Sequence, residues 1–144
     1  MMSGTRRDFI KKTCGLCASV AGIAILAPTL QGCSSLMRVQ PALIEGKLSL
    51  PVSSFVEEAK VVIIQNKDLE YDIAVVKYLD NTYRSFEMRC THQETSLVPT
   101  NSGFHCNMHG SSFSLTGKVN NKPATENLKE FKTFLDSGII QVSI

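Results

Sequence analysis

The sequence predicts an all-β domain built from small antiparallel sheets. Three observations indicate this fold class: several short runs rich in β-branched and aromatic residues, turn residues between these runs, and no stretch with sustained helical spacing. The chain has 144 residues, of which 43% are hydrophobic and 19% charged, so it has room for a single folded domain. This length excludes a multidomain enzyme, and the composition excludes a disordered polyelectrolyte.

The chain begins with a basic head and a long uncharged stretch. Arg6, Arg7, Lys11 and Lys12 lie in the first twelve positions, and the next charged residue is Arg38. The apolar centre of the stretch, about 14 residues, is typical of an export signal and shorter than a membrane span. Without the head the chain is nearly neutral, so no nucleic-acid-binding surface is expected.

Two short motifs in residues 1–33 indicate an export route and a lipidation site. The paired arginines, followed by Phe9 and Ile10, resemble the twin-arginine export signal of bacteria. The sequence Leu-Gln-Gly-Cys at residues 30–33 resembles a lipobox, in which cleavage leaves Cys33 as the lipidation site. We therefore expect residues 1–32 to be a signal of the twin-arginine, lipoprotein type and residues 33–46 to be a tether.

An uncleaved anchor helix over residues 13–37 is the alternative to cleavage and lipidation. Both interpretations place the domain on the outer, periplasmic side of the bacterial cytoplasmic membrane, because the basic head stays inside. The Cys14-x-x-Cys17 spacing imitates a dithiol redox site, but it lies inside the apolar stretch without a βαβ pattern around it.

Residues 47–144 form the predicted domain. The first predicted strand covers residues 61–65, and residues 72–79 and 83–90 are expected to form a hairpin across the turn at Asp80-Asn81. Helix-forming residues within 55–62 allow one short helical turn. Five further strands are expected, the last two joined by a turn at residues 136–138, and they cover residues 103–106, 112–115, 118–119, 131–135 and 139–144.

The candidate site consists of two cysteine–histidine pairs. The body of the chain keeps two of the five cysteines, and two of the three histidines follow them closely, as Cys90-x-His92 and Cys106-x-x-His109. A binuclear iron–sulfur cluster needs four protein ligands, two for each iron. We expect the two cysteines to hold one iron of a [2Fe-2S] cluster and the two histidines to hold the other.

These pairs, with Gly110-Ser111, Gly117-Lys118-Val119 and Pro123-Ala124, resemble the Rieske [2Fe-2S] family. The resemblance implies one cluster per chain, bound by a subdomain at about residues 88–125 that is inserted at the tip of a larger antiparallel β base. It also implies that the Pro123 loop lies over the cluster and that the Ser111 hydroxyl bonds to a cluster sulfur. Histidine ligands imply a reduction potential of about −150 to +300 mV.

Two departures from the family pattern bear on the chemistry. Quinol-oxidising members have a disulfide between the two ligand loops, and this chain has Thr95 and Met108 at the matching positions. The family also has a tyrosine that donates a second hydrogen bond at the cluster, and this chain has Phe113 there. We therefore predict a reduction potential in the middle of the family's range.

The sequence predicts an exported, membrane-tethered one-electron carrier without catalytic residues of its own. The alternative is a Rieske subunit of a respiratory oxidoreductase of the quinol–cytochrome or arsenite-oxidase type. Candidate partners are a cytochrome, an oxidoreductase subunit and quinol. A structural zinc site is a further alternative, since two cysteines and two histidines also satisfy tetrahedral zinc.

The remaining residues of interest have plainer interpretations. His105 adjoins Cys106 on a predicted strand and is expected to point away from the cluster. Met88 and Met108 are expected to pack near it rather than to bind iron. The four lysines of the later part of the chain are expected to form a solvent-exposed face: Lys118, Lys122, Lys129 and Lys132.

Overall fold

The computed structural model describes residues 36–56 and 59–144. The predicted export signal at residues 1–32 and the predicted lipidation site Cys33 lie outside the described residues, as does the Cys14-x-x-Cys17 pair. In the part that the structure describes, no helix has the length and apolar character needed to cross a membrane.

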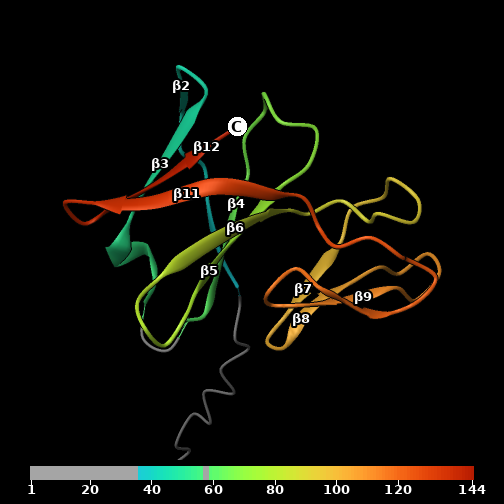
Figure 1. Cartoon of the computed structure of the whole chain (residues 1–144). Coiled ribbons are helices and arrows are strands. Elements are labelled where there is room, and N and C mark those ends of the chain that lie inside the picture. The colour runs from blue at the N-terminus through green and yellow to red at the C-terminus, as the bar shows by residue number, and fades with distance from the viewer. Residues whose placement is uncertain (1–35, 57–58) are drawn as a thin grey trace, which may run out of the picture. The chain divides into compact units, whose positions relative to one another are not determined.

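Twelve strands and one short 3-10 helix make up the described chain (Figure 1). In chain order they are β1 (Met37–Val39), β2 (Leu43–Ile44), β3 (Lys47–Pro51), η1 (Val52–Ser54), β4 (Val61–Ile64), β5 (Ile73–Lys77), β6 (Tyr83–Glu87), β7 (Val98–Thr100), β8 (Gly103–His105), β9 (Ser112–Ser114), β10 (Val119–Asn121), β11 (Glu130–Asp136) and β12 (Ile139–Ser143).

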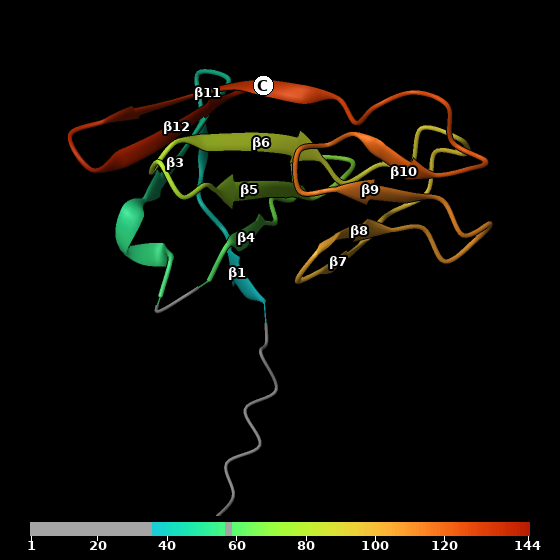
Figure 2. The ribbon, with the colours of Figure 1, turned by 60° about the horizontal axis from the view of Figure 1, so that its bottom comes forward.

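The strands form two sheets, which confirms the predicted all-β class. The larger sheet has eight strands in the order β1-β4-β5-β6-β11-β12-β3-β2, and the smaller has four in the order β10-β9-β8-β7. The strand pairs are antiparallel except β1 and β4, which run parallel. Figure 2 shows the small sheet beside the β4–β6 part of the large one.

Strands β4 and β5 are buried on both faces and so contribute to two hydrophobic cores. Every residue of β4 is buried, as are the first four residues of β5. Because side chains alternate across a strand, Val61 and Ile63 face the core shared with the small sheet. Val62 and Ile64 face a second core formed with β3, β12 and Phe131. This double burial explains why the sequence of β4 is a continuous apolar run rather than an alternating one.

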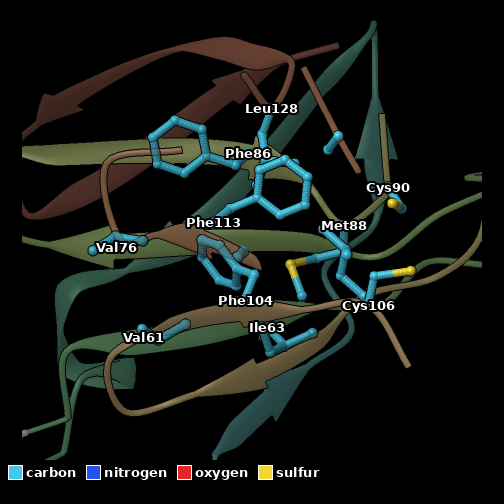
Figure 3. Packing of buried hydrophobic residues seen from close by; sticks show 13 residues of the cluster. Val61, Ile63, Val76, Phe86, Met88, Cys90, Phe104, Cys106, Phe113 and Leu128 are labelled. Carbon is cyan, nitrogen blue, oxygen red and sulfur yellow. The ribbon is translucent and has the colours of Figure 1, made fainter. Parts of the chain in front are cut away.

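The small sheet is attached to the large one mainly through aromatic side chains (Figure 3). The rings of Phe86 and Phe104 lie 6.4 Å apart between their centroids, and Phe113 is buried in the same core. Gly117 has a positive φ of 75°, and a Cβ there would lie 2.6 Å from the Phe86 ring. Glycine at 117 therefore allows the backbone to approach Phe86 closely.

Most predicted strands are confirmed within one to three residues, including the hairpin of β5 and β6. Two strands, β1 and β2, lie in the segment expected to be a tether, and β3 and β7 lie where no strand was expected. The only helical turn in the described residues is η1, which precedes the expected position. Strands of two or three residues, such as β1, depend on pairing with distant partners and leave little local pattern in the sequence.

Candidate metal centre

Two hairpin loops of the same design carry the cysteine–histidine pairs. We call residues 90–95 loop 1 and residues 106–111 loop 2. In loop 1 the Cys90 N–H donates to the Thr95 carbonyl at 2.8 Å, and in loop 2 the Cys106 N–H donates to the Ser111 carbonyl at 2.8 Å. Loop 2 joins β8 to β9, while an Arg89–Ser96 bridge closes the base of loop 1. Each cysteine is therefore the first residue of a six-residue tip.

The two cysteines are inside the protein and the two histidines are at its surface. Cys90 and Cys106 are unbridged and buried, and Figure 3 shows both at one end of the shared core, beside Met88. His92 and His109 are exposed, and their ring centroids lie 5.3 Å apart. The fold thus brings together the four residues that the sequence analysis selected, as a buried thiol pair and an exposed imidazole pair.

The donor set fits a binuclear cluster. Two imidazoles on one tetrahedral ion have centroids roughly 5 Å apart, given a metal–nitrogen bond of about 2.1 Å, and the observed 5.3 Å agrees with this. Cys90 and Cys106 are both buried in the core that the two sheets share. Within residues 36–56 and 59–144, no three His, Cys, Asp or Glu side chains are close enough together to hold a single metal ion.

A third loop lies against both ligand loops. This loop covers residues 121–126 and contains a cis Lys122-Pro123 bond. The Asn121 side chain donates to the Gly110 carbonyl at 3.2 Å, and the Thr91 hydroxyl donates to the Glu126 carbonyl at 2.7 Å. These contacts hold the Pro123 loop against the two tips, and in Figure 2 the three loops lie at the same end of the described domain.

Ser111 is fully buried beside this third loop. Its Oγ accepts a hydrogen bond from the Ala124 N–H at 3.0 Å. A hydroxyl that accepts one bond still has its own hydrogen to donate. The bond from the Ala124 N–H therefore leaves the Ser111 hydrogen free to donate, which is the role that the family resemblance implies for it.

The surroundings of the Cys106 sulfur lower the pKa of its thiol. Burial would raise the pKa of the Cys106 thiol, but bonds from the Thr95 hydroxyl, the Met108 N–H, the Cys90 thiol and the His109 N–H outweigh burial and hold the pKa below its ordinary value. A thiol of this kind favours the thiolate, which is the form that binds metal.

Sequence reasoning missed the contact made by Thr95, which it treated only as the replacement of a disulfide cysteine. The Thr95 Oγ1 lies 3.3 Å from the Cys106 Sγ, so loop 1 contacts the cysteine sulfur of loop 2. A threonine alone gives no signal of this contact. The available signal is positional, because Thr95 and Ser111 are both hydroxyl residues at the sixth position of their loops.

Loop 1 is also held by two side chains outside it. Arg89 Nη1 donates to Glu94 Oε1 at 2.6 Å, and the Tyr71 hydroxyl donates to the Glu94 carbonyl at 2.8 Å. The Arg89 guanidinium also lies over the Tyr71 ring, 5.9 Å from its centroid. Arg89 and Tyr71 thereby fix the backbone next to Thr95.

The other residues of interest lie as follows. His105 is exposed on β8 between buried neighbours, away from the buried cysteines. Met88 packs in the shared core with both cysteines, as expected. Met108 is 60% exposed, which corrects the expectation that it packs, because the tip of loop 2 holds it toward solvent. Exposed positions are found for Lys118, Lys122, Lys129 and Lys132.

Buried thiols, exposed imidazoles and paired hairpin tips on an antiparallel β base are the features that the sequence analysis expects of an iron–sulfur protein with mixed cysteine and histidine ligation. A family model for the Rieske [2Fe-2S] domain matches residues 48–132. The chain belongs to the Rieske [2Fe-2S] family, and its domain binds a [2Fe-2S] cluster. This family assignment rejects the zinc alternative.

Solved structures share the fold. The plasma membrane Rieske protein PetC3 from Synechocystis PCC 6803 is 22% identical, with 67% of this chain and 99% of that one covered and a TM-score of 0.57. A chain from the complex of oxygenase and ferredoxin in carbazole 1,9a-dioxygenase is 20% identical, with coverages of 69% and 94% and a TM-score of 0.53. The ferredoxin of Sphingomonas yanoikuyae B1 is 23% identical, with coverages of 68% and 98% and a TM-score of 0.50. A search of curated proteins gave no match. The chain is thus a Rieske-domain protein that shares its fold with these structures.

Proposed function

We propose that the chain is an exported, membrane-tethered one-electron carrier whose cluster ligands are Cys90, His92, Cys106 and His109. The observation that carries this proposal is the pairing at the loop tips, where two buried thiols lie behind two imidazoles 5.3 Å apart. The cysteines bind one iron and the histidines the other, so that each loop contributes to both.

When bound, the cluster supplies one-electron redox chemistry. The residues of this chain control where the electron passes. The cysteines and the core around them exclude water from one side, while the exposed edges of His92 and His109 offer a short path to a docked partner. Neutral imidazoles in place of two thiolates remove negative charge and raise the reduction potential.

Iron and acid-labile sulfide analysis of anaerobically purified protein tests the cluster itself. We expect two irons and two sulfides per chain, visible colour, and a paramagnetic signal after reduction. Colourless protein without sulfide and without that signal would refute the function. Substitution of His92 or Cys90 by alanine is expected to abolish the signal, while His105→Ala, in the third histidine, is the matched control that keeps it.

The sequence of the predicted export signal, residues 1–32, supports export and tethering to the membrane. Its basic head, paired arginines and cysteine at position 33 support a lipid anchor on the periplasmic side of the cytoplasmic membrane. The similar PetC3 is described as a plasma membrane protein, which is compatible with this location. The mass of the mature amino terminus tests it, because lipidation requires a chain that begins at a modified Cys33. An intact leader in the membrane fraction would support the anchor helix instead.

A second candidate function is that of a Rieske subunit in a respiratory oxidoreductase of the quinol–cytochrome or arsenite-oxidase type. The exposure of both imidazoles favours it, because an exposed histidine ligand can exchange a proton as well as pass an electron. A reduction potential that falls with pH near neutrality would support quinol as the donor, and a flat profile would support simple electron carriage. Purification from membranes in mild detergent identifies the partner, whether cytochrome, oxidoreductase subunit or oxygenase.

The reduction potential is proposed to lie in the middle of the Rieske range. Phe113 is buried in the shared core and has no hydroxyl to donate, so one of the two family donors is missing. A hydrogen bond to a charged acceptor contributes about 1.5–3 kcal/mol, equivalent to about 60–130 mV for one electron. A redox titration with a midpoint near +300 mV would contradict this reasoning.

A further inference from the structure

Thr95 and Ser111 occupy equivalent positions in the two ligand loops. Each is the sixth residue of its loop, and each accepts the loop-closing hydrogen bond from the N–H of the first residue, a cysteine. Each also has a hydroxyl. Ser111 Oγ accepts from the Ala124 N–H, whereas Thr95 Oγ1 contacts the sulfur of Cys106.

The Thr95 contact crosses from one loop to the other. Its Oγ1 lies 3.3 Å from the Cys106 Sγ, and Cys106 is buried. A cysteine that binds iron is a thiolate and has no proton, so in that state only the Thr95 hydroxyl can donate. The direction of the hydrogen bond is therefore fixed by the chemistry of the ligand.

The position of the Thr95 hydroxyl is constrained from both sides. The Thr95 carbonyl accepts from the Cys90 N–H at 2.8 Å. The preceding residue, Glu94, is held by Arg89 through its carboxylate and by Tyr71 through its carbonyl. A donor fixed in place by its neighbours acts on a nearby charge without first having to reorganise.

We propose that the Thr95 hydroxyl raises the reduction potential of the cluster by donating a hydrogen bond to the Cys106 thiolate, and that it partly replaces the donor missing at Phe113. The proposal rests on the proposed function, in which Cys106 is a ligand. Reduction adds one electron from an external donor, dithionite in the test, and makes the sulfur more negative. A hydrogen bond to that sulfur is stronger in the reduced state, so it favours reduction.

The test compares the midpoint potentials of Thr95→Val, Thr95→Ser and the wild-type protein. Valine keeps the shape of threonine without the hydroxyl, and serine keeps the hydroxyl. We expect Thr95→Val to change the ratio of reduced to oxidised protein about tenfold toward the oxidised form, a shift of about 59 mV to lower potential. Thr95→Ser is expected to keep a potential close to that of the wild-type protein, which a purely steric role for the side chain would not produce.

Thr100→Val is the matched control. Thr100 is in β7 of the same small sheet, and its hydroxyl donates to the Gly103 carbonyl at 3.0 Å rather than to a sulfur. We expect its potential to equal that of the wild-type protein. A Thr95→Val potential equal to that of Thr100→Val would overturn the inference.

The two proposals fail in different ways. Wild-type protein without a cluster refutes the proposed function, whereas coloured Thr95→Val protein with an unchanged potential refutes only the role of Thr95. Loss of the cluster in both Thr95→Val and Thr95→Ala, with Thr100→Val intact, would also overturn the inference, because Thr95 would then be a structural link between the loops.

Discussion

Replacing Ser111 by alanine removes one buried oxygen that has two separate roles. Ser111 is fully buried, and its Oγ accepts the Ala124 N–H at 3.0 Å. In the proposed holoprotein the same hydroxyl donates to a cluster sulfur. Ser111→Ala therefore changes two measurable quantities: the free energy of unfolding of the apoprotein and the reduction potential of the holoprotein.

The size of each change follows from the bond that is lost. Without the Ser111 oxygen, the buried Ala124 N–H has no acceptor, and an unsatisfied buried donor costs about 1–3 kcal/mol. A hydrogen bond to a charged acceptor contributes about 1.5–3 kcal/mol. Because the cluster sulfur is more negative in the reduced state, loss of this bond is expected to lower the potential by up to about 60–130 mV.

Urea unfolding of the apoprotein and redox titration of the holoprotein measure these two changes separately. Ser112→Ala is the control, because Ser112 is the next residue, is half-buried in β9 and is also a serine. We expect Ser112→Ala to change neither quantity appreciably. An unchanged unfolding free energy in Ser111→Ala would refute the contribution of the Ala124 bond, and an unchanged potential would refute the role of Ser111 as a donor.

Three further variants test the ligands, the small sheet and the surface. His109→Cys adds a thiolate and is expected to lower the potential toward the value of about −400 mV of all-cysteine clusters; an unchanged redox titration would count against His109 as a ligand. Gly103→Ala places a Cβ 2.1 Å from the Phe113 carbonyl oxygen. Urea unfolding should therefore show a free energy of unfolding lower by about 2–4 kcal/mol. A variant as stable as the wild-type protein would contradict the close approach of β8 and β9. Hydrogen bonds from Arg84 hold the pKa of Glu130 below its ordinary value. A lowered folded-state pKa stabilises the protein above the unfolded-state pKa, and this stability is lost as the pH falls through the folded-state pKa. Because both side chains are partly exposed, Glu130→Gln should lower the free energy of unfolding at neutral pH by at most about 1 kcal/mol. The variant should also lose less stability than the wild-type protein as the pH falls. If both proteins lost the same stability in acid, the ion pair would be refuted.

The sequence predicted most of the larger strands, although not β3, and selected the four candidate ligands, because each of these leaves a local signal. The apolar run of β4 and the turn at Asp80-Asn81 are visible without knowledge of their partners. The two cysteine–histidine pairs are equally local. The pairing of the two sheets through Phe86, Phe104 and Phe113 depends on distant contacts, and no short window of sequence encodes it.

The hydrogen bonds around the candidate ligands were the least predictable part of the site. The Ala124 N–H on Ser111 and the Thr95 hydroxyl on Cys106 each join residues from different loops, 13 and 11 positions apart. A pattern can identify which residues have hydroxyl groups, but only the fold determines which donor reaches which acceptor. For the same reason the exposure of Met108 could not be predicted from its apolar character.

The sharing of one core by β4, β5 and the small sheet limits how this redox centre can be transplanted. Phe104 and Phe113 are each only 1% exposed, and they are covered in part by Val61, Ile63 and Val76 of the base. A fragment containing only residues 88–125 would leave these rings in water and would lack most of its apolar packing. A protein engineer who wishes to graft the centre onto another scaffold must therefore carry the β4–β6 wall along with it.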